Sequence, residues 1–365
     1  MSDQSYPLYS CDDHLDMNAV PPDVWTSRAP SKHREDVPHV VDRDGQATWV
    51  AGGRFAGVSG SYGGSKHLTA LSRAGLESDP FRPGKPKERM EDMERDDIYA
   101  SLVYGPFALF APNVEDAALK KIVLQGWNDW AAEEFNAYMP DRLSAFPFLP
   151  VGSPEEASEE LERCARMGHR GAIVSPSDVN LHDPAWDRLW QTASEVDLPI
   201  SFHIGGGAST VRPKLGTWEF AAFGAVVPMQ MDEPLAIMIY SGALERNPGL
   251  KLVLAESGVG WLPYFVHRLD AIFEKHCAPN PEYSIKTRPT ELFERQVWAT
   301  FEEEPLGPDL IPLLNPDNFM WACDYPHPDS TWPESRKAIE HSLSTLGPEA
   351  VRKVTSDNCR TLYRL

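Results

Sequence analysis

Short apolar runs alternate with longer amphipathic segments along most of this 365-residue chain. Several runs are almost continuously apolar, which is typical of parallel strands that are covered on both faces. Eight runs are predicted to be strands: Leu8–Cys11, Ser101–Tyr104, Ala145–Leu149, Ala172–Ser175, Ile200–His203, Lys251–Ala255, Val297–Phe301 and Phe319–Cys323.

The segments between these strands carry apolar residues at helical spacing. The predicted helices are Glu115–Tyr138, Pro154–Met167, Pro184–Glu195, Glu233–Ser241, Leu262–Lys275 and Glu334–Leu346. Regular alternation of eight strands with helices predicts an α/β fold of the (β/α)8 TIM-barrel type. A doubly wound open sheet is less favoured, because no G-x-G-x-x-G motif opens a helix after the first strand.

One segment, Thr26–Asp96, departs from the alternation. It is rich in Gly, Pro, Ser and charged residues, although Trp49, Phe55 and Tyr62 give it apolar side chains that can pack. It follows the first predicted strand, so we expect an insertion in the first βα loop, at the mouth of the barrel. The sequence thus predicts one domain over residues 1–365, in which residues 26–96 form a lid, a subunit contact or both.

Composition narrows the class of protein. The formal charge of −20 disfavours nucleic acid and anionic membranes as partners. No apolar run reaches the length of a membrane span, and the N-terminus has no pattern of a secretory signal. The five cysteines form no C-x-x-C pair, so neither a disulfide framework nor a thiolate zinc site is indicated. We expect a cytoplasmic protein.

Polar side chains with metal-binding chemistry stand at the ends of four predicted strands. Asp12 and His14 are two residues apart, so on a strand they share a face. His203, Glu256 and Asp324 end or follow three other strands. Catalytic residues of a barrel come from the carboxyl ends of its strands, so these side chains are expected to converge. Carboxylate and imidazole groups together suit a divalent transition metal.

Each of these residues also has a purely structural interpretation. His203 can be a hydrogen-bonded structural histidine, and Asp324 can cap the segment that follows it. Glu256 can orient a metal ligand instead of reacting itself. His327 can cap its own loop. The shared position at strand ends favours the functional interpretation over these alternatives.

The motifs around these residues resemble the decarboxylase-type branch of the amidohydrolase superfamily, the amidohydrolase 2 or ACMSD-like family. The resemblance covers nearly the whole chain apart from Thr26–Asp96. It is carried by Asp12-Asp13-His14, Pro21-Pro22-Asp23-Val24-Trp25, Phe202-His203, Ala255-Glu256-Ser257-Gly258-Val259-Gly260-Trp261-Leu262-Pro263, Cys323-Asp324-Tyr325-Pro326-His327 and Asn358-Cys359-Arg360-Thr361-Leu362-Tyr363.

The resemblance implies a divalent metal held by Asp12, His14, His203 and Asp324. Zinc is expected first, and manganese or iron are the alternatives. The chain departs from the family where decarboxylases often carry a histidine at the position of Glu256. We therefore expect Glu256 and His327 to be the catalytic acid/base groups, or to form a second metal pocket with Asp16.

Two classes of reaction remain open from the sequence. The first is non-redox C–C cleavage (decarboxylation) or hydrolysis of a small carboxylate-bearing substrate. The second is oxygenation, because the chain also resembles subunits of a 2-aminoisobutyric acid hydroxylase-type complex. In such a complex this chain would be either catalytic or a metal-stabilised structural partner. The substrate remains unnamed, and Arg54, Arg212 and Arg268 are the candidate carboxylate-binding residues.

The chain is expected to form a homo-oligomer, or a hetero-oligomer with a homologous barrel chain. The helix predicted over Glu115–Tyr138 contains Trp127, Trp130 and Phe135, more aromatic surface than helix–sheet packing requires. This helix and the insertion are the predicted contact surfaces. Trp218 and Trp261 are the tryptophans expected to line a pocket.

Overall fold

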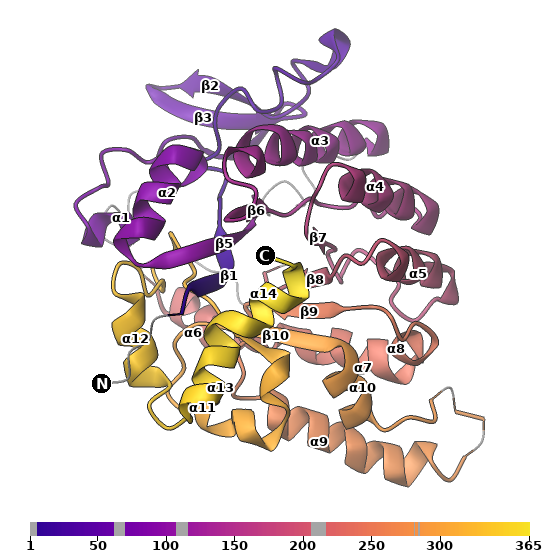
Figure 1. Cartoon of the computed structure of the whole chain (residues 1–365). Helices are drawn as coiled ribbons and strands as arrows, with labels where there is room; N and C mark the ends of the chain where they lie inside the picture. Colours follow the sequence, from indigo (N-terminus) through magenta and orange to yellow (C-terminus); the bar gives the residue numbers. More distant parts are fainter. Residues whose placement is uncertain (1–5, 62–69, 107–115, 206–216, 281, 284) are drawn as a thin grey trace.

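Eight parallel strands form the centre of the molecule in the computed structural model, which describes residues 6–61, 70–106, 116–205, 217–280, 282–283 and 285–365. The strands are β1 Leu8–His14, β5 Ile98–Tyr104, β6 Leu143–Ala145, β7 Ala172–Ile173, β8 Ile200–His203, β9 Leu252–Ala255, β10 Val297–Phe301 and β11 Phe319–Trp321. Each overlaps a run predicted from the sequence. The predicted α/β architecture is therefore confirmed (Figure 1).

The strands pair in two groups. One has the order β1-β5-β6 and the other the order β11-β10-β9-β8-β7. An isolated bridge between Phe148 and Ile173 joins the chain after β6 to β7. At the other edge, the backbone N–H of His14 donates to the carbonyl of Tyr325 (2.7 Å), and that of Asp324 donates to the carbonyl of Asp12 (3.0 Å). The two groups thus contact each other at both edges.

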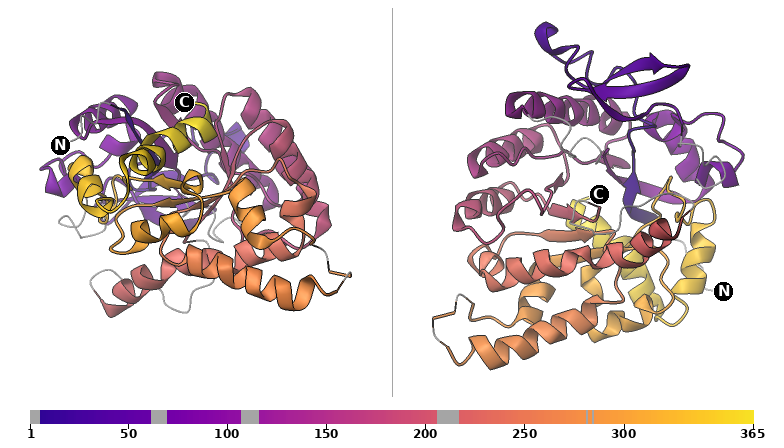
Figure 2. Two further views of the ribbon diagram at one scale, coloured as in Figure 1. Left: turned by 60° about the horizontal axis from the view of Figure 1, so that its bottom comes forward. Right: turned by 180° about the vertical axis from the view of Figure 1, so that it is seen from behind.

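Helices surround the strands (Figures 1 and 2). The longer ones are α2 Pro86–Arg95, α3 Ala117–Trp130, α4 Pro154–Arg166, α5 Asp187–Glu195, α6 Trp218–Val226, α7 Asp232–Tyr240, α9 Leu262–Ile272, α10 Pro289–Gln296 and α12 Ser335–Ser342. The short ones are α1 Ala70–Arg73, α8 Ala243–Arg246, α11 Gly307–Leu310, α13 Pro348–Arg352 and α14 Asn358–Tyr363. Wide-turn π segments extend α3 over Ala131–Asn136, α9 over Phe273–Cys277 and α13 over Lys353–Asp357.

Local sequence explains where the helices begin. Ser153 caps α4 because its hydroxyl accepts the N–H of Glu156 (3.2 Å), and Pro154 occupies the first turn, where its missing N–H costs nothing. Asp116 caps α3 in the same way, accepting the N–H of Leu119 (2.9 Å). Their apolar faces are buried against the strands. The helices therefore form where capping and periodicity agree.

The third predicted strand is wrong in its bounds. The sequence places it at Ala145–Leu149, whereas β6 ends at Ala145. Pro147 lies inside the predicted range and has no N–H to donate to a sheet ladder, so pairing stops before it. Only the bridge from Phe148 to Ile173 resumes the contact.

The segment between β1 and β5 contains a small antiparallel sheet of β2 His39–Arg43, β3 Gln46–Ala51 and β4 Arg54–Val58. Trp49 of β3 is fully buried against Trp25, whose indole N–H donates to the carbonyl of Val123 in α3 (2.8 Å). The sheet therefore packs beside α3, at the top of Figure 1. Phe55 is 56% exposed and does not pack as expected, and Tyr62 lies outside the described residues.

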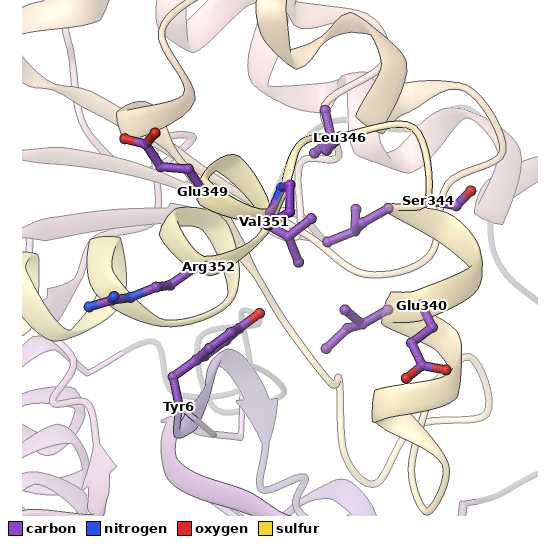
Figure 3. Close-up of a pocket in the computed structure, with 10 residues that line it drawn as sticks. Tyr6, Glu340, Ser344, Leu346, Glu349, Val351 and Arg352 are labelled. Carbon is purple, nitrogen blue, oxygen red and sulfur yellow. The ribbon is translucent and has the colours of Figure 1, made fainter. Parts of the chain in front are cut away.

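A cavity of about 470 Å³ opens between α12 and α13, lined by Tyr6, Leu343 and Arg352 among others (Figure 3). Tyr6 precedes β1, so this cavity lies at the amino ends of the strands and not at their carboxyl ends. Among the described residues, no helix is both long and apolar enough to span a membrane.

Candidate metal centre

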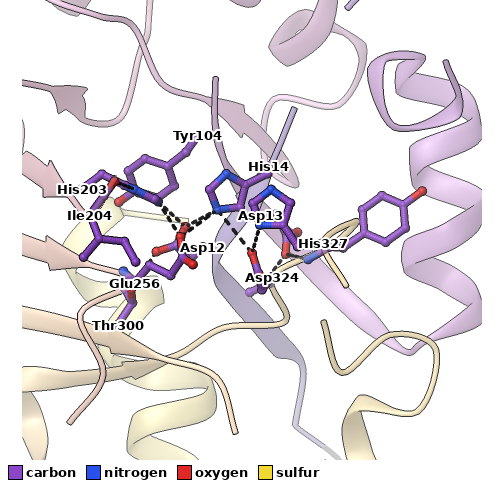
Figure 4. Close-up of polar contacts among 12 residues, drawn as sticks. Asp12, Asp13, His14, Tyr104, His203, Ile204, Glu256, Thr300, Asp324 and His327 are labelled. Carbon is purple, nitrogen blue, oxygen red and sulfur yellow. Dashed lines mark hydrogen bonds and ion pairs between the residues drawn. The ribbon is translucent and has the colours of Figure 1, made fainter. Parts of the chain in front are cut away.

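The last residues of β1 present alternating side chains with two different tasks. Asp12 and His14 are both buried and point to one face, as their spacing predicts (Figure 4). Asp13 faces the other way and forms an ion pair with the fully buried Arg89 of α2 (3.3 Å). Asp13 also accepts hydrogen bonds from Ser10 (2.6 Å) and Ser101. The end of β1 thus directs Asp12 and His14 to one face, while Asp13 on the other face binds α2.

Five side chains from four strand ends converge at one point (Figure 4), which we call the candidate metal centre: Asp12, His14, His203, Glu256 and Asp324. Nε2 of His14 lies 3.4 Å from Oδ1 of Asp12, 3.5 Å from Oε2 of Glu256 and 3.3 Å from Oδ1 of Asp324. Nε2 of His203 lies 3.4 Å from both Oδ1 of Asp12 and Oε2 of Glu256. The sequence-predicted residues are therefore brought together.

These spacings fit donors that share one ion. Two ligand atoms that are each about 2.1 Å from a metal lie about 3.0–3.4 Å from each other at octahedral to tetrahedral angles. Oδ1 of Asp12 is buried and accepts no hydrogen bond from the described residues. A buried carboxylate oxygen with no donor is costly unless a cation satisfies it. The donor set and its geometry therefore fit a divalent cation.

The outer contacts of these groups also suit metal binding. Nδ1 of His203 lies 2.8 Å from the carbonyl of Ile204, and we assign its proton there, which leaves the lone pair on Nε2 for the centre. The hydroxyl of Thr300 donates to Oδ2 of Asp12 (2.8 Å) and accepts the N–H of Glu256 (2.7 Å). Thr300 thus holds the carboxylate of Asp12 and the backbone of Glu256 at once.

His327 lies on the other side of His14. The two rings stack with centroids 3.9 Å apart and an interplanar angle of 23°. Nδ1 of His327 is 2.9 Å from Oδ1 of Asp324, and Nε2 is 3.0 Å from Oδ2 of Asp16. His327 is therefore held between two carboxylates beside the candidate metal centre.

The carboxylates create a strongly cation-attracting site. Burial and the charge of His327 oppose protonation of His14, but the carboxylates of Asp12, Glu256 and Asp324 outweigh them and raise its pKa to about 10. Burial acts against His327 as well, yet Asp324 and Asp16 raise its pKa well above the usual value. Burial raises the pKa of Asp324 to about 6, aided by Glu256 and opposed by His327. The carboxylates therefore favour positive charge at this site, which a divalent cation would also supply.

The family comparison agrees with this geometry. The profile of one family, described as Amidohydrolase, matches residues 28–365. The chain belongs to the amidohydrolase family. The resemblance expected from the motifs is thereby confirmed.

Curated relatives of this amidohydrolase include decarboxylases. It is 28% identical over 249 residues to a gamma-resorcylate decarboxylase of Polaromonas sp., covering 60% of this chain and 72% of the relative. It is also 28% identical over 267 residues to the gamma-resorcylate decarboxylase of Rhizobium sp. (strain MTP-10005), and this match covers 65% of this chain and 75% of the relative. A 2-keto-4-carboxy-3-hexenedioate hydratase of Sphingobium sp. is 26% identical over 192 residues, and this match covers 49% of this chain and 50% of the relative.

Solved structures share the fold of this amidohydrolase. An amidohydrolase from Mycobacterium avium subsp. paratuberculosis superposes with a TM-score of 0.74 at 20% identity, covering 98% of both chains. A dihydroxybenzoic acid decarboxylase from Polaromonas sp., solved with bound manganese and an inhibitor, superposes with a TM-score of 0.63 at 18% identity, also covering 98% of both.

Sequence reasoning missed two residues of the amidohydrolase site. Thr300 lies in β10, and Glu302 follows the end of that strand. Oε1 of Glu302 is buried and has no hydrogen-bond partner among the described residues. Burial, together with the charges of Glu256 and Asp324, raises the pKa of Glu302 well above its usual value. The signal was available, because Glu302 follows a predicted strand just as Glu256 does.

Three arginines and two tryptophans were also candidates from the sequence. Arg54 and Arg268 are exposed, and Arg212 lies outside the described residues. Trp218 is 72% exposed, whereas Trp261 is partly buried and donates its indole N–H to the carbonyl of Ser257 (2.7 Å).

Proposed function

We propose that this chain is a metal-dependent decarboxylase that acts on a small, carboxylate-bearing aromatic compound. The observation that carries the proposal is the convergence of Asp12, His14, His203, Glu256 and Asp324 within ion-sharing distance at the strand ends. The gamma-resorcylate decarboxylases among its relatives support the class of substrate. Non-redox cleavage is thus favoured over the other reactions expected from the sequence.

In this proposal Asp12, His14, His203 and Asp324 hold the ion. A divalent ion bound there polarises a carboxylate or hydroxyl oxygen of the substrate. Manganese is our first choice, because a structural neighbour carries it and because carboxylate oxygens suit it. Zinc, the first expectation from the sequence, and iron are the alternatives.

Glu256 and His327 are the proposed acid/base groups. Decarboxylation of an aromatic acid requires a proton to reach the ring carbon that bears the carboxylate. The C–C bond then breaks, its electrons return to the ring, and CO2 leaves. His327 stacks on His14 and is held between Asp16 and Asp324, so it can keep a proton at the edge of the centre. Glu256 faces both His14 and His203, and its carboxylate can accept or donate a proton.

Addition or removal of water is a second candidate reaction. The hydratase among the relatives favours it, and Glu256 stands where a carboxylate can act as general base toward a water molecule. Oxygenation, in a complex with a homologous chain, stays a prediction that none of these relatives supports.

The finer architecture is part of the same proposal. We propose that the eight strands form one closed (β/α)8 barrel within a single domain, supported by the contacts at both edges of the two strand groups. The insertion acts as a lid in this proposal. Its helix α1 reaches the loop that carries His327, because Arg73 donates to the carbonyls of Pro328 (2.7 Å) and Trp332 (3.0 Å). The cytoplasmic location also stays a prediction.

Metal content and CO2 release test the proposal together. The purified protein, loaded separately with manganese, zinc or iron, is incubated with a panel of hydroxybenzoates, and CO2 and the decarboxylated phenol are measured. We expect release that requires metal and is lost in H203A together with stoichiometric binding. H267A, on the exposed face of α9, is the matched control. Full metal retention in H203A, or turnover only when O2 and a homologous chain are supplied, would overturn the proposal.

A further inference from the structure

The loop after β9 begins with Glu256 and leads into α9. Glu256 has a φ of 51°, and Gly258 follows with a φ of 67°, so the chain turns sharply directly after the strand. Left-handed backbone at a residue other than glycine costs free energy and persists only where the surrounding structure holds it. The position of the Glu256 carboxylate therefore depends on the contacts that hold this loop.

The neighbouring strand β10 holds the first part of the loop. Strands β9 and β10 pair in parallel, so their carboxyl ends lie side by side (Figure 1). Thr300 of β10 accepts the N–H of Glu256 at its hydroxyl (2.7 Å) and the N–H of Gly258 at its carbonyl (3.1 Å). The start of the loop is thus fastened to β10 at two points.

A carboxylate holds the second part of the loop. Glu304, in the segment after β10, accepts the N–H of Val259 at Oε1 (2.6 Å) and the N–H of Gly260 at Oε2 (2.9 Å). Burial raises the pKa of Glu304, and these two N–H groups oppose that rise. Hydrogen bonds to an ionised carboxylate are roughly twice as strong as those between neutral groups. Both oxygens of Glu304 are therefore engaged by the backbone of the loop.

Three glycines leave the space that the carboxylate of Glu304 occupies. A Cβ placed on Gly258 would lie 2.7 Å from Oε1, and one placed on Gly260 would lie 3.0 Å from Oε2. A Cβ placed on Gly307, the first residue of α11, would collide with Oε2 as well. The position of this carboxylate is thus limited by the surrounding backbone and fixed by two donors.

We infer that Glu304 is a positioning residue for the candidate metal centre, because it holds the loop after β9 and thereby fixes where the Glu256 carboxylate lies. Oε2 of Glu256 is 3.5 Å from Nε2 of His14 and 3.4 Å from Nε2 of His203. An acid or base must stay within hydrogen-bond reach of the proton it transfers, and a displacement of about 1 Å can lower a rate about 100-fold. The inference rests on the proposed acid/base role of Glu256.

The chain offers a matched control in Glu303. This residue precedes Glu304 in the same segment, carries the same charge and is exposed. E303Q and E304Q therefore remove the same charge from the same segment. E304Q keeps the size of the side chain, but its amide NH2 must face one of the two N–H groups, so that one hydrogen bond becomes a contact between two donors.

Turnover of the metal-loaded protein tests the inference in two backgrounds. In the wild-type background we expect kcat to fall about 10- to 100-fold in E304Q, with metal content unchanged, and to stay within about twofold in E303Q. In the E256Q background, E304Q should change kcat by less than about twofold, because the group that Glu304 positions is already lost. A purely structural role would lower kcat by the same factor in both backgrounds.

Amide hydrogen exchange gives a readout that does not require turnover. Exchange at Val259 and Gly260 should become about tenfold faster or more in E304Q, and it should stay unchanged in E303Q. Exchange at Glu256 should also become faster, although its own N–H bonds to Thr300 and not to Glu304. A wild type that releases no CO2 would refute the proposed function, whereas exchange at Glu256 would still decide the role of Glu304.

G260A is the second variant, for the case that the circular dichroism spectrum shows E304Q to be unfolded. Its added methyl group presses on Oε2 of Glu304, and the next nearest atom is Cα of Gly307 at 3.7 Å. It should change kcat and exchange at Glu256 in the same direction as E304Q, but by less. Wild-type exchange at Glu256 in both variants, or an equal loss of kcat with and without the Glu256 carboxylate, would overturn the inference.

Discussion

Thr300 contacts two residues of the candidate metal centre without being one of the proposed metal ligands. Its hydroxyl holds Oδ2 of Asp12 at 2.8 Å and receives the N–H of Glu256 at 2.7 Å. We expect T300V, which keeps the side-chain shape but removes the hydroxyl, to weaken metal binding by about 10- to 100-fold. T300S keeps the hydroxyl and is the control. Chelator competition measures both affinities, and equal values would exclude an orienting role for Thr300.

Metal binding should depend on pH through His14. With a pKa of about 10 in the metal-free protein, His14 carries a proton at neutral pH that an ion must displace. The metal-free state therefore binds more protons than the metal-bound state. Apparent affinity should rise as the pH increases toward about 10, by about tenfold per pH unit for each displaced proton. Calorimetry in buffers of different ionisation enthalpy counts these protons, and an unchanged enthalpy would contradict the prediction.

Glu256 separates chemistry from metal binding. In E256Q the four proposed metal ligands remain, so we expect metal content close to that of the wild type and a fall in kcat of about 100-fold or more, the usual contribution of a general acid or base. Metal analysis and turnover are measured on the same samples. Wild-type turnover in E256Q would make Glu256 a structural residue only.

At the level of elements, α2 is fastened to the end of β1 by a buried ion pair. Arg89 is fully buried, contacts Asp13 at 3.3 Å and donates to the carbonyl of His14 at 3.0 Å. R89M leaves the carboxylate of Asp13 buried without its partner, which should lower the free energy of unfolding by about 3–5 kcal/mol. K337M, at an exposed ion pair on α12, is the control and should change it little. Urea unfolding measures the free energy of unfolding of both variants. Equal losses in R89M and K337M would show that Arg89 does not anchor α2 to β1.

The strands were predictable because each overlaps a short, largely apolar run. The residues at which strands end were less predictable. Strand β6 ends at Ala145, because Pro147 has no N–H to donate to the sheet. Helix α6 escaped prediction because it is apolar on all sides and has no helical periodicity to detect. The sheet of β2, β3 and β4 also escaped, because its short strands are set among glycines and polar residues.

The site was predictable where a side chain able to bind a metal stands at the end of a strand or directly after it. Asp12, His14, His203, Glu256 and Asp324 all follow that rule, and the structure brings them together. Thr300 did not stand out, because a threonine inside a strand is ordinary until its partners are known. Contacts between distant elements, such as Arg73 with the carbonyl of Pro328, depend on loop conformations that no local pattern encodes.

For the whole molecule, metal removal should reduce stability. The candidate metal centre joins the ends of β1, β8, β9 and β11, and without a cation its buried carboxylates rely on protons for neutralisation. A ligand present at about 1,000 times its dissociation constant stabilises the folded state by about 4 kcal/mol. The thermal midpoint should therefore fall on dialysis against EDTA and recover with manganese. H203A should show no such response, and a metal-independent midpoint in the wild type would contradict the assignment.

Glu256 and Asp324 have backbone φ angles of 51° and 59°, in the left-handed region that glycine adopts at little cost. Each of these residues thus lowers the stability of the fold while supplying a carboxylate to the site. Random variants selected only for resistance to heat, with metal withheld, should accumulate glycine or asparagine at these two positions. Variants selected for metal-dependent turnover should retain Glu256 and Asp324. Sequencing both populations would show whether selection for folding and selection for catalysis favour different residues at the same two strand ends.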